Sequence, residues 1–153
     1  MKKITSGLFL FLLLSFLLSA TDGFSSVMPD RLIGMNPLKF MELLGPPDSV
    51  YPLRGEEEWQ DDVVFFYEGE YYLYLYQNRI WQVRMDENSR LSTLGVQPGL
   101  SSAQVAENLN MAAEHSGEEW EIYFLAELPY PLRLRVFYRE GRAVDFYLYR
   151  GDF

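Results

Sequence analysis

The sequence predicts an α+β fold of two tandem helix-plus-antiparallel-hairpin repeats, with the helices packed on one face of an antiparallel sheet. Alternating aromatic, aliphatic and polar residues flank a turn residue able to adopt positive φ, once at 71–85 and again at 132–150. A short capped helical pattern precedes each hairpin. The two copies superpose at a spacing of 65 residues in the helices and 63 in the hairpins, which indicates an internal repeat.

The start of the chain predicts a secretory signal peptide. Lys2 and Lys3 supply positive charge, residues 8–18 are almost all apolar, and small residues follow around Ala20. The apolar run is shorter than the roughly 20 residues that a membrane-spanning helix needs. We therefore expect a cleaved signal, no stable membrane span afterwards, and export to the periplasm or the extracellular space.

The expected domain organisation follows from these two patterns. Cleavage should fall between Ala20 and Ser25. The expected units are a signal peptide at 1–23, a flexible lead-in at 24–33, a first repeat at 34–88 and a second repeat at 95–150. The two repeats together should form one compact domain.

Composition excludes several functions. The net charge is −9, and removal of residues 1–20, which hold two lysines and no acid, would make it −11. Such a chain should be repelled by nucleic acid and by anionic membranes. The absence of cysteine excludes disulfides, thiolate zinc sites, cysteine nucleophiles and a lipidated cysteine. A secreted domain without disulfides suits the bacterial cell envelope.

The first repeat should begin with a short helix. Asn36 can cap it, Pro37 occupies the favoured first position, and Gly45 ends it. Residues 48–62 should form a loop with one edge strand near Tyr51, before a strand at Val63–Tyr67 and the hairpin that turns at Asn78. The helix should place Phe40, Met41 and Leu44 on the sheet.

The second repeat follows the same order. Ser101 and Gln104 form a capping box for a helix to about Ala113, with Val105 and Leu109 on its buried face. A strand at Glu119–Ala126 and a proline-bearing loop lead to the final hairpin, which turns at Gly141.

A three-residue turn at Asn78 or Gly141 would fix which face each strand residue occupies. The residues expected in the core are Tyr71, Leu73, Leu75, Trp81, Val83, Met85, Leu134, Val136, Val144, Phe146 and Leu148. The opposite face should carry Tyr72, Tyr74, Tyr76, Ile80, Gln82, Arg84, Arg133, Arg135, Phe137, Asp145, Tyr147 and Tyr149. A slip of one residue would exchange the faces.

The outward face predicts protein binding, because interfaces are enriched in tyrosine and arginine. The residues expected to bind a protein partner are Tyr72, Tyr74, Tyr76, Arg84, Arg133, Arg135, Tyr147 and Tyr149. Tyrosine also has high strand propensity, and an Arg135–Asp145 cross-strand pair would suit an ordinary solvated face. Both interpretations remain open at this point.

Catalytic and metal sites are not indicated. His115 is the single histidine, and no nucleophile elbow, phosphate loop or paired metal-binding histidine occurs, so no cofactor is predicted. The acids from Glu56 to Asp62 lack the alternating spacing of a calcium loop. Two interpretations of these acids stay open: with those at 118–121 they steer a basic partner toward the sheet, or they form solvated loops that serve only solubility. Two alternatives to a binding module are a hydrolase that uses Glu57 or Asp61, and a structural subunit of an envelope assembly.

Several short motifs resemble those of the BamE (SmpA/OmlA) family and of the tandem-repeat β-lactamase inhibitor proteins. They are Gly34-Met35-Asn36, Leu44-Gly45-Pro46-Pro47, Arg79-Ile80-Trp81, and Gly99-Leu100-Ser101 with Val105 and Leu109. The resemblance implies a helix layer on an antiparallel sheet in a periplasmic or secreted protein that binds another protein. The chain lacks the lipidated cysteine of the first family and the disulfides of the second, and no partner-contacting residue is carried over.

Overall fold

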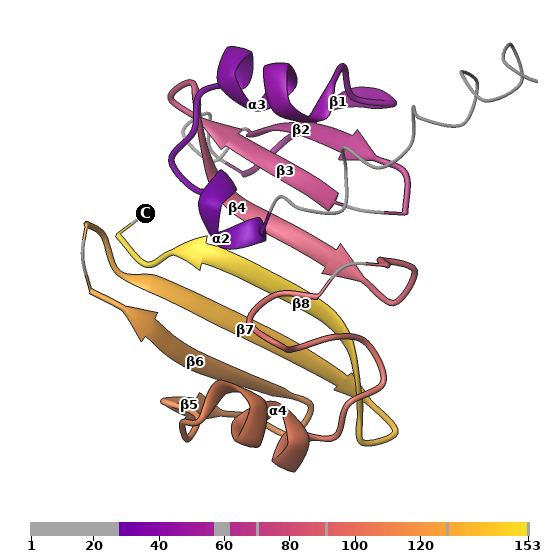
Figure 1. Ribbon diagram of the computed structural model, residues 1–153, viewed down its shortest axis with the longest axis vertical. Coiled ribbons are helices and arrows are strands. Elements are labelled where there is room, and N and C mark those ends of the chain that lie inside the picture. The colour runs from indigo at the N-terminus through magenta and orange to yellow at the C-terminus, as the bar shows by residue number, and fades with distance from the viewer. Residues whose placement is uncertain (1–27, 57–61, 70, 91, 128, 153) are drawn as a thin grey trace, which may run out of the picture.

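A single antiparallel sheet of eight strands organises the protein (Figure 1). The computed structural model describes residues 28–56, 62–69, 71–90, 92–127 and 129–152. The strands are β1 (Ser49–Leu53), β2 (Asp62–Tyr67), β3 (Tyr71–Tyr76), β4 (Arg79–Asp86), β5 (His115–Ser116), β6 (Trp120–Ala126), β7 (Leu132–Arg139) and β8 (Arg142–Arg150). The helices are α2 (Pro29–Leu32), α3 (Pro37–Leu44) and α4 (Ser102–Leu109). Across the sheet the order is β1-β2-β3-β4-β8-β7-β6-β5.

This architecture corrects the predicted fold class. In the described part of the chain the fold is mostly β, one eight-stranded antiparallel sheet with three short helices, and not a pair of tandem helix-plus-hairpin repeats. The two halves share one sheet because β4 and β8 pair along Gln82–Asp86 and Asp145–Tyr149.

The start of each longer helix is confirmed. In α3 the Asn36 side chain accepts a hydrogen bond from the Lys39 backbone N–H at 3.0 Å, and Gly45 follows with φ of 78°. In α4 the Ser101 and Gln104 side chains form the expected capping box.

The expected end of the second helix, near Ala113, is wrong. The helix α4 stops at Leu109 because Asn110 adopts a left-handed conformation with φ of 53°. Its backbone N–H still bonds back to Ala106 and Glu107, which satisfies the last turn.

The helix α2 was not predicted. Leu32 is completely buried and Ile33 nearly so. The Gly34 N–H donates to the Ile80 carbonyl at 2.7 Å, and the Tyr130 hydroxyl donates to the Ile33 carbonyl at 2.9 Å. Residues 29–33, which the sequence placed in a flexible lead-in, are therefore anchored to the sheet. The expected signal peptide lies outside the described residues.

The first hairpin turn differs from the expected one. Gln77 and Asn78 both have positive φ, 47° and 60°, and Tyr76 pairs with Arg79, so the loop has two residues. The register then shifts so that Trp81 is an extra, bulged residue in β4.

The second hairpin repeats this arrangement. Glu140 and Gly141 have φ of 53° and 72° and close a two-residue loop. Tyr138 pairs with Ala143 and Phe137 with Asp145, which leaves Val144 bulged in β8.

The bulges explain which side chains were placed correctly. A two-residue loop plus one bulged residue inserts as many unpaired residues into the hairpin as a three-residue loop does. The strand residues beyond each bulge therefore lie on the face that the sequence predicted. Between loop and bulge they are reversed: Ile80 is completely buried, whereas Trp81 lies toward the opposite face and donates to Asp62 at 3.1 Å. Similarly, Ala143 is buried and Val144 borders a surface hollow.

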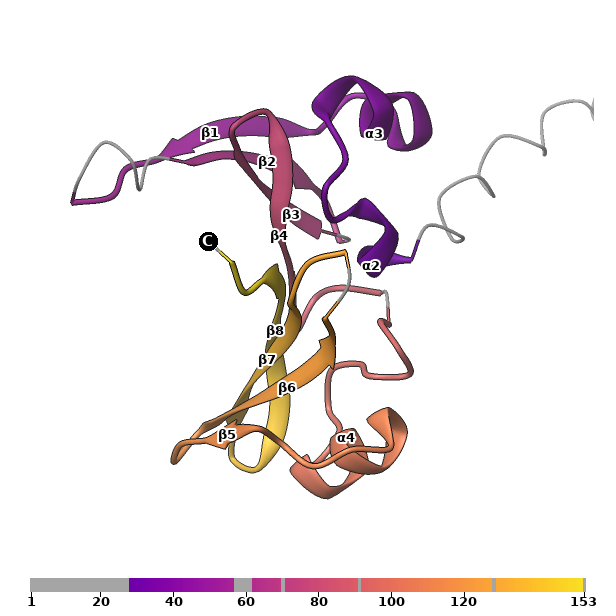
Figure 2. The same ribbon diagram turned by 90° about the vertical axis from the view of Figure 1, so that its left-hand side faces the viewer.

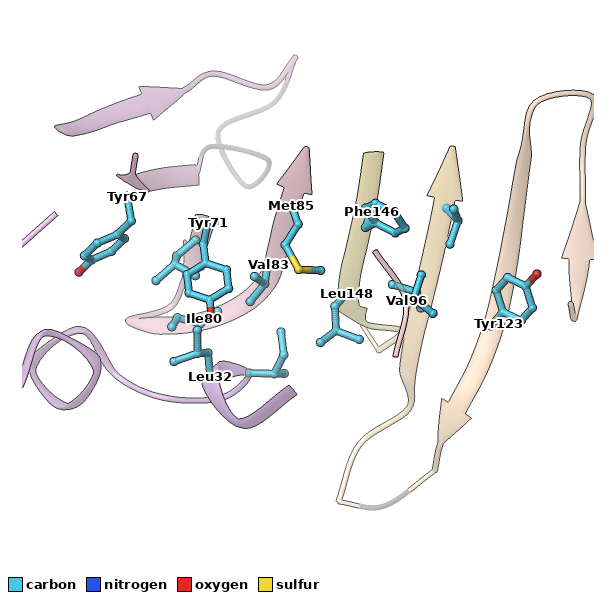
Figure 3. Packing of buried hydrophobic residues seen from close by; sticks show 14 of the residues in the cluster. Leu32, Tyr67, Tyr71, Ile80, Val83, Met85, Val96, Tyr123, Phe146 and Leu148 are labelled. Atoms are coloured by element: carbon cyan, nitrogen blue, oxygen red, sulfur yellow. The ribbon is translucent and has the colours of Figure 1, made fainter. Parts of the chain in front are cut away.

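The hydrophobic core lies between the sheet and the helices. Phe40 and Leu44 of α3 and Val105 and Leu109 of α4 belong to one cluster with the inward residues of the strands. Figure 3 shows this cluster continuing across the β4–β8 junction. The labelled residues there include Tyr71, Val83, Met85, Phe146 and Leu148. The two halves of the chain therefore share one core.

The helices α2, α3 and α4 all lie on the same side of the sheet, as the edge-on view in Figure 2 shows. We call the opposite side, which carries none of the described helices, the helix-free face. The β1–β2 pair at one end and β5 at the other extend toward this side, so the face lies on the inside of a curve (Figure 2).

The turn geometry makes a testable prediction at Glu140. Asparagine tolerates positive φ better than glutamate, and Asn-Gly is the preferred two-residue hairpin turn. We expect Glu140→Asn to raise the free energy of unfolding by about 0.5–1 kcal/mol, measured by urea denaturation. Gly141→Ala is the control and should lower it by about 1 kcal/mol. A Glu140→Asn protein less stable than the parent would contradict this turn assignment.

Candidate functional site

Two rows of side chains on the helix-free face run across the sheet, because every second residue of each strand points to the same side. The first row, in register, is Ser49, Phe66, Tyr72, Arg84, Tyr147, Arg135, Ile122 and His115. The second row is Tyr51, Val64, Tyr74, Gln82, Tyr149, Arg133 and Phe124. The rows bring together all the sequence-predicted binding residues except Tyr76, which pairs with Arg79 beside the turn.

An ion pair between Arg84 and Asp145 occupies the centre of the face. The Arg84 Nε lies 2.9 and 3.1 Å from the two carboxylate oxygens, and its Nη2 lies 2.9 Å from Oδ2. The side chains are only 28% and 20% exposed. Hydrogen bonding to Asp145 raises the pKa of Arg84 even though burial opposes this. The pair is a two-pronged, charge-assisted contact of the strong kind.

Tyrosine rings flank this ion pair on both neighbouring strands. The Arg84 guanidinium carbon lies 4.9 Å from the ring centre of Tyr72 and 5.6 Å from that of Tyr147, within cation–π range. The Tyr147 hydroxyl also donates to Asp145 at 3.2 Å. Burial, together with the charge of Asp145, raises the pKa of Tyr147 to about 12.

The expected Arg135–Asp145 cross-strand pair is not formed, since Asp145 faces Phe137 in the register and binds Arg84 instead. The other two arginines of the face also lie against aromatic rings. Arg133 lies over Phe124 at 5.4 Å and bonds Glu114 at 3.2 Å. Arg135 lies 5.9 Å from the ring centre of Trp120 and 5.6 Å from that of Tyr149.

Two open hollows lie at the end of the face where β4 finishes. One, of about 380 Å³, is lined in part by Arg84, Asp145, Phe137 and Val144. The other, of about 650 Å³, is lined in part by Phe66, Tyr72 and Arg90. Asp86 and Asn88 border both, so the two hollows meet at the turn that follows β4.

Glu121 was expected with the surface acids but lies on the helix side of the sheet. Its Oε2 accepts hydrogen bonds from Tyr123 at 2.6 Å and Tyr138 at 2.5 Å, and its Oε1 accepts one from Ser102 of α4 at 2.6 Å. Burial raises the pKa of Glu121, but the three hydroxyl donors outweigh this and the net pKa is lowered. Glu121 therefore links α4 to β6 and β7.

The remaining candidates for chemistry were His115 and the acids of the hydrolase alternative. His115 is exposed on β5. Glu57 and Asp61, the acids of the hydrolase alternative, lie outside the described residues. Within the described ranges no group of three or more histidine, cysteine, aspartate and glutamate side chains could hold a metal ion. No helix in this part of the chain is long and apolar enough to span a membrane.

Comparison with known proteins finds similarity at the level of structure. No family model and no curated protein matches the sequence. The fold is similar to an extracellular protein containing an SCP domain from Bacillus anthracis, with a TM-score of 0.58, 10% identity, and coverage of 88% of this chain and 49% of that one. It is also similar to a cysteine-rich secretory protein from Staphylococcus aureus, with a TM-score of 0.56, 12% identity, and coverage of 84% and 48%.

These matches identify a fold shared with bacterial SCP-type extracellular or secretory proteins. The chain spans about half the length of each. They also correct the resemblance to the BamE family and the tandem-repeat inhibitors, which is wrong. The motifs that carried it are helix caps and hairpin turns, and such signals recur in many unrelated folds.

The Glu121 hydrogen bonds predict a pH-dependent contribution to stability. A lowered folded-state pKa means that the carboxylate stabilises the fold above the unfolded-state pKa of about 4.5, and that this is lost as pH falls through the lower folded value. We expect Glu121→Gln to reduce the free energy of unfolding by about 1–3 kcal/mol at pH 7. The reduction should shrink toward pH 3.

Urea denaturation at pH 7, 5 and 3 would measure both effects. Glu118→Gln is the matched control, since this neighbouring glutamate is exposed. A Glu121→Gln penalty as large at pH 3 as at pH 7 would show that the stabilisation does not depend on the ionised carboxylate.

Proposed function

We propose that this chain is a non-catalytic, exported bacterial protein-binding module that contacts its partner through the helix-free face. The observation that carries the proposal is that the described helices α2, α3 and α4 lie on one side of the sheet (Figure 2), while the other side presents two rows rich in tyrosine and arginine. In an ordinary antiparallel sheet with one face in water, polar residues occupy that face and alternate along each strand with the residues that point into the core. Contiguous aromatic residues and arginine are instead typical of interface centres.

The chemistry of the face favours binding over proton transfer. The pKa values of Arg84 and Tyr147 are both raised, so both groups keep their protons near neutral pH. A general acid or base works best with a pKa near the working pH. The same groups are well suited to contact a partner, because each offers a large surface together with hydrogen-bond donors.

The partner is a protein of positive net charge. The chain carries −9, and long-range attraction favours a partner of opposite sign. A second copy would bring a further −9 and be repelled. The description of the two similar proteins as extracellular or secretory supports export.

Photo-crosslinking tests which face binds. A benzoyl-phenylalanine placed at Tyr149 should capture a specific protein from the secreted and cell-surface fraction of the source bacterium. The same group at Leu38, which is 73% exposed on α3, should not. Replacement of Tyr74 and Tyr147 by serine should reduce capture at position 149 at least tenfold. Equal capture at positions 149 and 38 would exclude the helix-free face as the binding surface.

The charge of the captured protein is a separate prediction. Its isoelectric point should lie above 8, and its association rate constant should fall several-fold between 50 and 500 mM NaCl, because screening weakens steering between exposed charges. Surface plasmon resonance would measure this rate. An acidic partner whose association rate is independent of salt would contradict the electrostatic part of the proposal.

A further inference from the structure

The two edges of the sheet differ in how well they are protected. At one edge β5 has only two residues, His115 and Ser116, and both are polar. At the other edge β1 has five residues, all of them exposed, and within the described part of the chain no strand pairs with its outer side (Figure 1). Natural proteins usually shorten or cover an edge strand, since its unpaired backbone groups can pair with another chain. The open edge of this sheet is therefore the one at β1.

Exposed hydrophobic side chains gather at the β1 edge. Eight large hydrophobic residues are exposed in the described part of the chain, and four of them lie on β1 or at the start of β2. They are Val50, which is 53% exposed, Leu53 (46%), Val63 (43%) and Tyr51 (38%). Exposed hydrophobic residues that are grouped, and not scattered singly, usually mark an interaction site. The side chains and the unpaired backbone of β1 thus favour the same use of this edge.

Pro52 indicates which backbone groups of β1 face outward. It pairs in regular register with Val63, inside the strand. Proline lacks an N–H, and within an edge strand it occupies positions whose N–H side faces solvent. Backbone groups alternate in direction along a strand, so Val50 faces outward as well. The outer side of β1 therefore presents the N–H and C=O of Val50 and the C=O of Pro52, and an added strand can bond all three.

Charge indicates what pairs with the β1 edge. Residues 48–62 contain six acids and one arginine, which is a local charge of −5. Asp48 precedes β1, and Asp62 pairs with Leu53 at the end of this strand, so negative charge lies at both ends of the edge. A second copy of this chain would bring the same charge to the same edge, and like charges opposite each other destabilise a sheet. Charge complementarity favours a basic segment instead.

We infer that a basic, extended segment of the partner protein adds to the outer edge of β1 as a further antiparallel strand. This inference rests on the proposed function and adds the way in which the partner binds. Ser49 and Tyr51 begin the two rows of the helix-free face, so a strand added beside them continues that face. Main-chain hydrogen bonds supply the affinity of such a contact, and alternate side chains of the added strand supply its specificity.

A synthetic peptide tests the β1 edge without the partner. The probe is a heptapeptide of alternating valine and threonine with a lysine at each end, and NMR follows hydrogen exchange of the backbone amides. Saturating peptide should slow exchange at Val50 about tenfold or more, because its N–H becomes hydrogen-bonded. Leu38, in the first turn of α3, is the control amide and should not change. No slowing at Val50, or equal slowing at Leu38, would overturn the inference.

A proline substitution gives a second test. Val50→Pro removes the outward N–H but retains the pairing of β1 with β2, since Pro52 already occupies this strand in the same orientation. Val50→Thr keeps the N–H and is the matched control. Loss of one main-chain hydrogen bond should weaken peptide binding, and binding of the protein captured from Tyr149, about tenfold in the proline variant only. Circular dichroism would verify that both variants are folded.

The outcomes separate this inference from the proposed function. Peptide protection of Val50 with no protein captured from Tyr149 would count against the proposed function alone. A captured protein that binds the Val50→Pro variant as tightly as the parent would overturn strand addition alone. Slower exchange at Val50 with rising protein concentration and no peptide, together with a dimer in sedimentation, would show that a second copy pairs with this edge and would overturn the assignment to a basic partner segment.

Discussion

The pairing of β4 with β8 is the interaction on which the rest of the structure depends. It joins the two halves of the chain into one sheet and lets their inward residues share one core. It also places Asp86 directly opposite Asp145, an arrangement of like charges that is unfavourable in a sheet. Each carboxylate has its own donor: Arg84 binds Asp145, and the Tyr72 hydroxyl donates to Asp86 at 3.0 Å. The donors at the centre of the helix-free face thus offset the repulsion between the two aspartates that the β4–β8 pairing brings together.

Local sequence signals predicted local structure well. The caps at Asn36 and Ser101 act within one helical turn, so their residue types are sufficient evidence for a helix start. The fold class was wrong because pairing between distant strands leaves no local signal. The bulges at Trp81 and Val144 were also missed, since a three-residue turn and a two-residue turn with a bulge give the same alternation farther along the strands.

The candidate site was predictable as a set of residues but not as a set of contacts. Period-two alternation placed tyrosine and arginine together on one face, and all but Tyr76 lie in the two rows. Which arginine meets which acid depends on strand order. Arg84 and Asp145 are 61 residues apart, so no spacing rule joins them. For the same reason, the sequence could not predict that Arg135 lies between two aromatic rings. Nor could it predict that Glu121 bonds to hydroxyl groups on the helix side of the sheet instead of lying with the surface acids.

The stacking of arginine between aromatic rings has a consequence for how tightly and how selectively such a face can bind. A flexible arginine that is immobilised when a complex forms opposes binding by about 0.5–1.5 kcal/mol through lost side-chain entropy. Here Arg84 and Arg135 are already held between rings in the free protein. The face is therefore preorganised: it loses little conformational freedom with a partner of matching shape, and it cannot readily remodel itself to accept others.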